Sequence, residues 1–308
     1  MQILPQHLMN TNSEDGGERA SVFFRTSLTL ILILISCNNP DREKKTFSAL
    51  PLPVKDSNTV LKKDSVIIPV VKKKTKKIYL TFDDGPNRGT RNVMEVLKED
   101  SIPATFFIVG QHVYGSKAQR MTWDSLLAMP DVELCNHSYT HAMRNHFQKF
   151  YSNPDTVVKD FQRTQDSLHL TNNIVRAPGR NCWRMDSLNY TDIKKSKTAI
   201  DSLEKAGFTV IGWDLEWHFN PQTLRVQNSA DALLKQIDSV FRRGRTKIPE
   251  HLVLLAHDQV YQSKVDLSEL KDLIQKLKQK DGYELALLKD YPAIKSMTDS
   301  SKSKTPLQ

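Results

Sequence analysis

The chain has 308 residues and three cysteines, with 39% hydrophobic residues, 26% charged residues and a formal net charge of +9 at pH 7. This composition excludes a fully disordered chain, a collagen-like chain, a multi-span membrane protein and a disulfide-dense scaffold. Because the excess positive charge lies in residues 38–77 (+7) and 295–308 (+2) rather than on a folded body, no nucleic-acid partner is predicted.

The first 37 residues have the features of an export signal. The apolar run 27–36, SLTLILILIS, is too short to span a bilayer, which takes about twenty residues, and fits the hydrophobic region of a signal peptide. The letters LISC, ending at Cys37, resemble a bacterial lipobox, which implies a lipid on Cys37. The alternative is a buried core segment that happens to end in cysteine. We expect an exported protein of the bacterial cell envelope, anchored to a membrane through Cys37.

Residues 38–76 are rich in Lys, Pro, Ser and Thr and show no sustained helical period. Such a composition predicts a disordered tether. The basic run 72–77 is interpreted as the solvated end of this tether, and contact with anionic lipid head groups is the alternative. Residues 294–308 are polar and predict a disordered tail.

Between residues 77 and 293, short apolar runs alternate with amphipathic helical patterns. Apolar residues recur at helical spacing in 157–168, 233–241 and 267–277. This alternation predicts about seven parallel strands with helical crossovers, in one barrel-like α/β domain whose functional residues lie at strand ends. The expected strands are 78–82, 104–109, 132–135, 173–176, 208–213, 252–256 and 283–287.

Two of these strand ends carry residues that suit metal binding and proton transfer. Asp83 and Asp84 follow the first strand, where one carboxylate can bind a cation while the other acts as a base. A simple Asp-Gly turn is the alternative. His137 and His141 are four residues apart, which on one helical turn is a metal-ligand spacing. Two unrelated surface histidines are the alternative.

Two further strand ends carry Arg176 and His257. The arginine can orient a carboxylate through charge-assisted hydrogen bonds, and a histidine in this position can act as a general acid. Each residue alone has an ordinary structural explanation, but the combination of the four sites has no good one.

In combination these residues resemble the NodB-type polysaccharide deacetylases, also called carbohydrate esterase family four. The resemblance covers about residues 77–290 and is most specific in TFDDGP at 81–86 and HSYTH at 137–141. The family implies a distorted (β/α) barrel with outer helices and metal-dependent removal of N- or O-acetyl groups from glycans. The other landmarks, in order, are ATFFIVG at 104–110, Arg176-Ala177-Pro178, Trp213-Asp214 and Leu255-Ala256-His257.

The resemblance implies that Asp84, His137 and His141 hold one divalent metal ion. This ligand set suits Zn²⁺, with Co²⁺, Mn²⁺ or Ni²⁺ as alternatives. The metal is expected to polarise the acetyl carbonyl and to activate water. Asp83 is implied as the base that takes the proton of this water, and Arg176 as the residue that holds Asp83.

The resemblance also assigns roles around the substrate. His257 is implied as the acid that protonates the leaving amine or alkoxide. The backbone N–H near Gly179 is expected to help bind the oxyanion, and Pro178 to line the groove beside it. Leu255 is expected to line the pocket for the acetyl methyl group.

The chain departs from the family pattern in two places. Gly179 stands where an aromatic residue usually follows Pro178. In the fourth motif, usually D-x-x-D-W, Glu216 takes the first acid position and Phe219 falls where the second acid is expected. That second acid normally tunes the catalytic histidine. Either Asp214 or Glu216 substitutes for it, or the acid is untuned.

For two pairs of residues the sequence allows two alternatives each. Trp213 and Trp217 stack on sugar rings or belong to the core. Cys135 and Cys182 lie beside motifs in a chain expected to be exported, so we predict either a disulfide between them or two separate buried thiols.

The leading functional prediction is a metal-dependent hydrolase that removes N-acetyl groups from an amino-sugar glycan, such as peptidoglycan, a chitin-like oligomer or an exopolysaccharide. An O-acetyl esterase, an amidase of a non-sugar, and a non-catalytic glycan-binding relic are the alternatives. An acetylated glycan is thus the expected partner, and no protein partner is implied.

Overall fold

The structure is a computed structural model that describes residues 75–186, 188–292 and 294, all within one compact unit, Ile68–Gln308. The predicted leader with Cys37, the tether up to residue 74 and the tail from residue 295 lie outside the described residues. No helix in the described part of the chain is both long and apolar enough to cross a bilayer.

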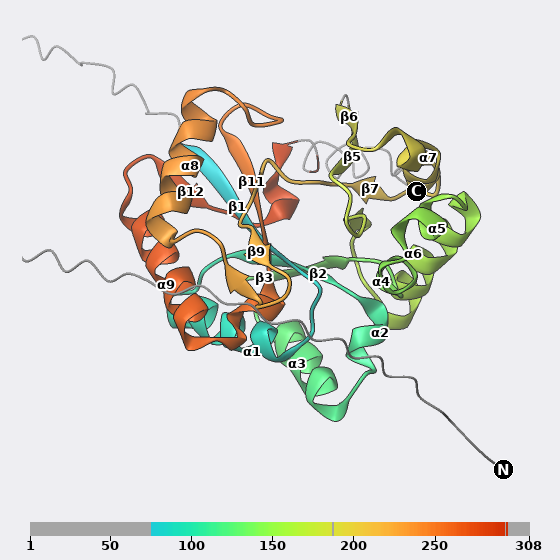
Figure 1. Cartoon of the computed structure of the whole chain (residues 1–308), viewed down its shortest axis with the longest axis horizontal. Helices are drawn as coiled ribbons and strands as arrows, with labels where there is room; N and C mark the ends of the chain where they lie inside the picture. The colour runs from blue at the N-terminus through green and yellow to red at the C-terminus, as the bar shows by residue number, and fades with distance from the viewer. Residues whose placement is uncertain (1–74, 187, 293, 295–308) are drawn as a thin grey trace, which may run out of the picture. The chain divides into compact units, whose positions relative to one another are not determined.

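A curled ten-stranded sheet forms the centre of this unit (Figure 1). The strand order is β6-β5-β7-β4-β3-β2-β1-β11-β8, and β12 pairs with β1. All pairs are parallel except those of β5 with β6 and β7, and β9 and β10 form a separate antiparallel pair. The strands are β1 (Lys76–Asp83), β2 (Ala104–Ile108), β3 (Val132–Asn136), β4 (Ile174–Val175), β5 (Cys182–Met185), β6 (Leu188–Thr191), β7 (Thr209–Val210), β8 (Leu215–Glu216), β9 (Phe219–Asn220), β10 (Arg225–Val226), β11 (His251–His257) and β12 (Tyr283–Leu285).

The predicted barrel-like, mostly parallel α/β fold is confirmed in this half-barrel, which also contains the unpredicted short strand β8, paired in parallel with β11. Two further differences concern the other end of the sheet. The hairpin of β5 and β6 was not predicted, and it extends the sheet at one edge with antiparallel strands. The strand expected at 208–213 pairs only over Thr209–Val210, so the chain reaches Trp213 as loop. This loop runs along the site described below.

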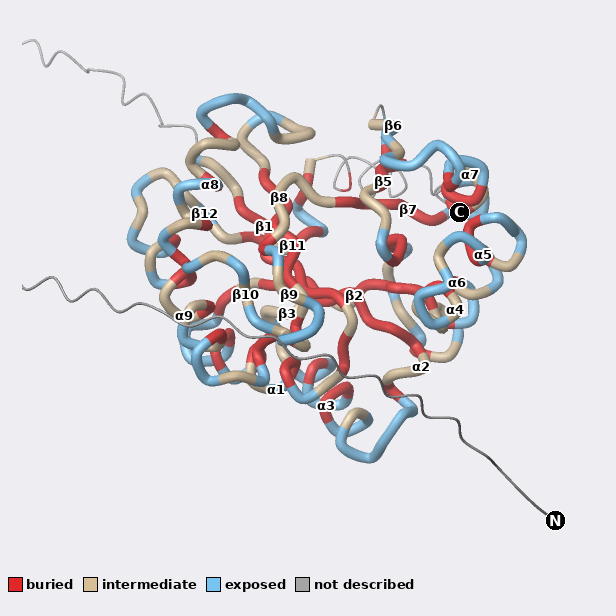
Figure 2. The backbone as a smooth tube through the Cα atoms, in the orientation of Figure 1, coloured by how far each residue is buried: buried red, intermediate tan, exposed pale blue. Residues whose placement is uncertain are grey.

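Helices cover the outside of the sheet, and burial concentrates in the central strands (Figure 2). The helical pattern predicted at 157–168 corresponds to α6, which Asn153 caps by accepting the Thr156 N–H at 3.1 Å. The helices are α1 (Arg88–Glu99), α2 (Gly110–Val113), α3 (Lys117–Leu127), α4 (His141–Asn145), α5 (Phe147–Tyr151), α6 (Pro154–Leu168), α7 (Lys197–Lys205), α8 (Ala230–Arg242) and α9 (Lys264–Gln279), with 3₁₀ turns η1 (Lys194–Ser196), η2 (Asp258–Gln262) and η3 (Leu288–Asp290).

The two faces of strand β1 differ, because one packs in the hydrophobic core and the other leads to the polar residues of the site. Alternate residues from Ile78 to Phe82 pack in the hydrophobic cluster that lies under α1, α8 and α9. The other face of the strand carries Tyr79, then Thr81, then Asp83. Tyr79 belongs to a second cluster inside the curl of the sheet. The interior is therefore apolar at one end and becomes polar toward the carboxyl end of β1.

The structure settles one alternative and shifts the bounds of the domain. Cys135 and Cys182 are separate free thiols, both buried, so the disulfide is wrong and the alternative of two buried thiols is confirmed. Ile294, assigned to the tail, is only 4% exposed and packs in the same cluster as Tyr291. The packed body therefore reaches at least residue 294, and it begins with β1 at Lys76 rather than at residue 77.

Candidate active site

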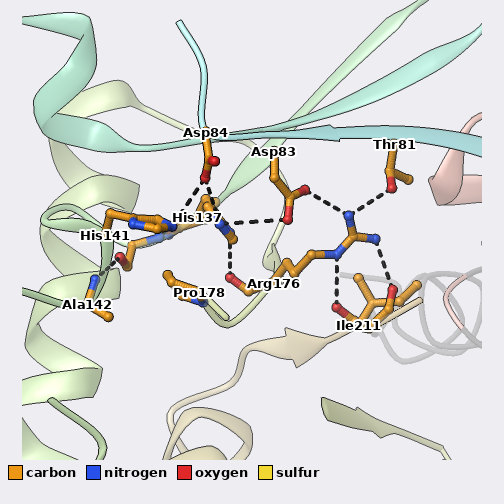
Figure 3. A network of polar contacts seen from close by, with 12 residues as sticks. Thr81, Asp83, Asp84, His137, His141, Ala142, Arg176, Pro178 and Ile211 are labelled. Atoms are coloured by element: carbon orange, nitrogen blue, oxygen red, sulfur yellow. Dashed lines mark hydrogen bonds and ion pairs between the residues drawn. The ribbon is translucent and has the colours of Figure 1, made fainter. Parts of the chain in front are cut away.

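The carboxylates of Asp83 and Asp84 point in different directions because the backbone turns between them. Asp83 is the last residue of β1, and its side chain keeps to the interior face of the strand. Asp84 has a φ of +82°, in the left-handed half of conformational space. Its carboxylate faces two imidazoles, whereas that of Asp83 faces a guanidinium (Figure 3).

The guanidinium of Arg176 fixes Asp83. Its Nη1 donates to Asp83 Oδ1 at 2.8 Å and to Thr81 Oγ1 at 2.7 Å, and its Nη2 donates to the Gly212 carbonyl at 2.9 Å. The arginine is 0% exposed and lies over the ring of Phe107, with Cζ 4.1 Å from the ring centroid. Burial lowers the pKa of Arg176, and the Asp83 carboxylate opposes that shift. This pairing leaves Asp83 Oδ2 facing the site.

Asp84, His137 and His141 offer ligand atoms that all lie within 4.8 Å of one another. Asp84 Oδ1 is 3.1 Å from His141 Nε2 and 3.5 Å from His137 Nε2, yet this buried oxygen accepts no hydrogen bond within the described residues. Burial opposes ionisation of Asp84, but the two imidazoles outweigh it and hold the pKa of this carboxyl well below its usual range.

The other ring nitrogen of each histidine is already engaged. His137 Nδ1 lies 2.9 Å from the carbonyl of Arg176, which can only accept, so this nitrogen carries the proton. His141 Nδ1 lies 2.5 Å from Asn145 Oδ1. Both Nε2 atoms then present lone pairs toward a carboxylate oxygen, an arrangement that a cation between them would satisfy. The residues therefore fit a divalent metal ion with two imidazole ligands and one carboxylate ligand.

The reason given from sequence for the pairing of the two histidines is wrong. His137 follows β3 directly, and the segment to His141 is not helical. Instead, α4 is a left-handed turn in which residues 141–145 all have φ between 49° and 69°. It closes with a bond from the Arg144 N–H to the Thr140 carbonyl at 2.8 Å. This turn brings the His141 ring to 5.2 Å from that of His137.

His257 ends β11, directly opposite Asp83 in the register of the β1–β11 pair. Leu255, two residues earlier, is buried on the same face of the strand. His257 Nδ1 is buried and has no hydrogen-bond partner among the described residues. The Phe219 ring lies against the imidazole, with centroids 4.9 Å apart. An apolar ring thus occupies the place where the family pattern has an acid.

Neither of the two acids proposed as substitutes bonds to His257. Asp214 accepts the backbone N–H groups of Lys247 at 2.7 Å and of Val253 at 2.8 Å. Glu216 pairs with His218, the two side chains lying 3.4 Å apart. The predicted tuning role of Asp214 and Glu216 is therefore wrong, because both carboxylates are engaged elsewhere.

The residues predicted to line the substrate groove divide into two groups. Pro178 is buried, on the side of the site away from β1 (Figure 3). Its carbonyl accepts the Tyr151 hydroxyl at 2.7 Å. Gly179 is exposed, and its N–H donates to no acceptor in the described part of the chain. Trp213 is half-buried beside the Arg176 guanidinium. Trp217 is 2% exposed and donates to the Asn228 carbonyl, so its predicted contact with sugar is wrong.

Sequence reasoning missed two polar residues beside the metal ligands. His112 Nδ1 lies 2.8 Å from the Asp84 carbonyl, and burial lowers the pKa of this imidazole against the effect of that carbonyl. Gln259 Nε2 donates to Asp84 Oδ2 at 3.3 Å. Both follow strand ends, at 104–109 and 252–256, so the rule that found the other site residues also applies to them.

Asp258 was also missed, although it follows His257. It is fully buried and accepts hydrogen bonds of 2.5 Å from Asn87 Nδ2 and Thr90 Oγ1, the two residues that cap α1. A Cβ on Gly85 would lie 2.4 Å from Asp258 Oδ2. Burial raises the pKa of Asp258 to about 8, against the effect of these hydrogen bonds. Asp258 therefore joins the loop after Asp84 to the end of β11.

Comparisons with known proteins support the resemblance drawn from the motifs. The model of the family described as "Polysaccharide deacetylase" matches residues 70–211. The Bacillus subtilis protein YheN, provisionally named a polysaccharide deacetylase, is 27% identical over 287 residues, which cover 88% of this chain and 91% of that protein. The peptidoglycan-N-acetylglucosamine deacetylase of Bacillus cereus is 27% identical over 216 residues, 69% of each chain.

Solved structures show the same fold. A carbohydrate esterase family 4 enzyme of Streptococcus mutans aligns with a TM-score of 0.51 and 22% identity, covering 70% of this chain and 87% of its own. The catalytic domain of a peptidoglycan N-acetylglucosamine deacetylase from Eubacterium rectale aligns with a TM-score of 0.51 and 20% identity, covering 71% and 90%. The resemblance predicted from the motifs is confirmed, because the polysaccharide deacetylase model matches residues 70–211 and the two relatives align over 88% and 69% of this chain.

Proposed function

We propose that the protein is a metal-dependent hydrolase that removes N-acetyl groups from an amino-sugar glycan such as peptidoglycan, a chitin-like oligomer or an exopolysaccharide. The single observation that carries this proposal is the placement of Asp83. Its carboxylate is held by Arg176 at 2.8 Å, next to the Asp84–His137–His141 set and opposite His257. The residues proposed as base, metal ligands and acid thus lie at one end of the sheet.

A divalent ion bound by the three ligands, Zn²⁺ by preference, supplies Lewis-acid polarisation of the acetyl carbonyl and lowers the pKa of nearby water. Asp83 Oδ2 takes the proton from the attacking water, while Arg176 keeps Oδ1 in place. The Gly179 N–H donates to the oxyanion that forms on the acetyl group. His257 then protonates the leaving nitrogen as the carbon–nitrogen bond breaks, which yields acetate and a free amine.

A specific observation favours a second candidate, an O-acetyl esterase. No carboxylate in the described residues hydrogen-bonds to His257 Nδ1, and Phe219 lies beside the ring. An amine must be protonated to leave, whereas an alkoxide leaves with less help from an acid. A weakly supported acid therefore disfavours amide cleavage more than ester cleavage.

Acetate release tests both candidates. The purified protein is given Zn²⁺ or Co²⁺ and assayed on N-acetylglucosamine oligomers, peptidoglycan and O-acetylated xylan. We expect Asp83→Asn to lower kcat by about 10²–10⁴-fold with the metal content unchanged. We expect Asp84→Ala to lose both metal and activity. Full activity after removal of the metal by a chelator would contradict the proposal, and release from the O-acetyl substrate alone would favour the esterase.

We also propose that the protein is exported and lipid-anchored at the bacterial cell envelope. The support is the sequence alone, namely the apolar run 27–36 and the lipobox-like letters that end at Cys37. Growth of cells that express the chain with an alkyne fatty acid should label it. The Cys37→Ser variant should stay unlabelled, and labelling of that variant would reject the anchor.

A further inference from the structure

A surface groove of about 690 Å³ lies beside the site and is not used by the reaction above. Its walls come from the end of the left-handed turn α4, from α5 and from Arg180, which follows the predicted oxyanion donor Gly179. It is adjacent to a metal ligand, because the Phe147 ring in its wall lies edge-on to His141 with centroids 6.0 Å apart.

Phe147 takes the place of the aromatic side chain missing at position 179. A Cβ built on Gly179 would lie 2.9 Å from Phe147 Cε1 and 3.0 Å from Cζ. Gly179 also has a φ of +62°, which disfavours any other residue there. The half-buried Phe147 ring therefore packs on the bare backbone next to the site, and the aromatic wall of the groove comes from α5.

The groove is cationic. His146 and Lys149 are exposed along it, and the Arg180 guanidinium lies 5.6 Å from the centroid of the Phe147 ring. Arg180 also donates to Ser196 Oγ and to the Gly179 carbonyl, which fixes its position. Lys149 and Arg180 form no ion pair within the described residues, and the chain has no Asp or Glu between residues 134 and 154.

We propose that this groove binds a carboxylate-bearing sugar next to the acetylated sugar, so that the substrate class is an acidic glycan. The inference rests on the proposed function for the placement of the acetylated sugar at the metal site. The Phe147 ring supplies an apolar wall for a sugar ring. Lys149 and Arg180 supply charge-assisted hydrogen bonds to its carboxylate. A neutral polymer offers neither cation an anionic partner.

Equilibrium binding tests the inference without turnover. The Asp83→Asn variant is titrated with a hyaluronan tetrasaccharide, with the same oligosaccharide as its methyl ester, and with neutral chitotetraose. We expect the acid to bind about tenfold more tightly than its ester at low salt. Arg180→Gln and Lys149→Gln, each added to that variant, should each remove about threefold of this preference. Lys159→Gln, an exposed cation on α6 outside the groove, is the matched control.

Equal affinity for acid and ester would overturn the inference, as would a preference that Arg180→Gln and Lys149→Gln both leave intact. An acetate-release assay of the wild-type protein separates this failure from failure of the proposed function. Acetate release by the wild-type protein without any preference for the acid removes the groove assignment and leaves the deacetylase standing. A preference for the acid without acetate release from any glycan removes the deacetylase and keeps the groove as a saccharide site.

Discussion

At the scale of single residues, Asp83 and Asp84 show how one backbone angle separates two roles. Both have the same side chain, but the φ of +82° at Asp84 turns its carboxylate away from the face that Asp83 keeps. One carboxylate is then neutralised by Arg176 and the other faces two imidazoles. The sequence predicted that one of these carboxylates binds a cation while the other acts as a base. It did not predict the positive φ.

The apolar neighbour of His257 leads to a prediction about its acid role. Phe219→Asp places a carboxylate beside the imidazole and stabilises its protonated form. We expect the alkaline limb of the pH–rate profile for N-acetyl substrates to move up by about one pH unit, with a higher kcat above pH 7. Phe219→Leu is the control that removes the ring without adding charge. An alkaline limb at the same pH in Phe219→Asp, in a variant that melts as the wild type does, would reject this account.

Asp214 makes stability depend on pH. Burial raises the pKa of Asp214 to about 6, although the N–H groups of Lys247 and Val253 lower it. The folded state therefore holds a proton that the unfolded state has lost above about pH 4, and the free energy of unfolding falls as pH rises from 4 to 6. The shift of about two units corresponds to about 3 kcal/mol.

Asp214→Asn removes this titration. Denaturant unfolding at pH 4 and pH 7 should show the variant gaining up to about 3 kcal/mol on the wild type between the two pH values. The informative quantity is the difference in the free energy of unfolding between the variant and the wild type, because the contributions of the other titrating groups cancel in that difference. A difference that stays constant with pH, or that moves the other way, would contradict the burial argument.

At the scale of elements, α4 has a backbone conformation that lowers the free energy of unfolding. A left-handed turn costs about 1–2 kcal/mol per residue for side chains other than glycine, and none of residues 141–145 is glycine. The strain persists because the turn places His141 against Asp84 and His137. Stability is thus given up where the ligand set needs an unusual backbone, a common pattern at functional sites.

The direction in which one substitution changes the free energy of unfolding tests whether α4 is strained. Arg144 is exposed with a φ of +57°, so Arg144→Gly should raise the free energy of unfolding by about 1 kcal/mol. Arg91 is exposed in the right-handed helix α1, so the same change there should lower it by about 1 kcal/mol. The measurement is denaturant unfolding of both variants. Destabilisation of similar size in both would show that α4 is not strained.

The position of a site residue could be predicted from the sequence where that residue stands at the end of a parallel strand. Asp83 and His257 could be placed together because the carboxyl ends of parallel strands meet at one edge of a sheet. Contacts between loops distant in the sequence could not be predicted in this way. Phe147 covers Gly179 only because α5 folds over the loop after β4, and no local pattern encodes that approach. Likewise, Trp217 lies in the core because it packs against residues distant in the sequence, such as Tyr261.

At the scale of the whole molecule, metal binding should appear as stability, because only the folded chain brings the three ligands together. A ligand at one hundred times its dissociation constant adds about 2.7 kcal/mol to the free energy of unfolding. For a domain of this size that is roughly 5–10 °C in Tm. We expect Zn²⁺ to produce such a rise, and a chelator to reverse it.

Substitutions at the two adjacent aspartates make this test of metal binding specific. Asp84→Ala should abolish the rise in Tm, because it removes a ligand. Asp83→Asn should keep it, because that carboxylate pairs with Arg176 instead. The reverse result would exchange the roles of the two residues.

The pairing of β1 with β11 also bears on how the site comes into being during synthesis. The metal ligands and Asp83 are made early in the domain, but the strand that carries His257 is made last among the site elements. At 5–20 residues per second, a ribosome needs roughly 10 to 35 seconds to travel from position 83 to position 257. Throughout that interval one edge of β1 lacks its neighbour. The site therefore stays incomplete until β11 has been made, and hydrolysis becomes possible only when translation is almost finished.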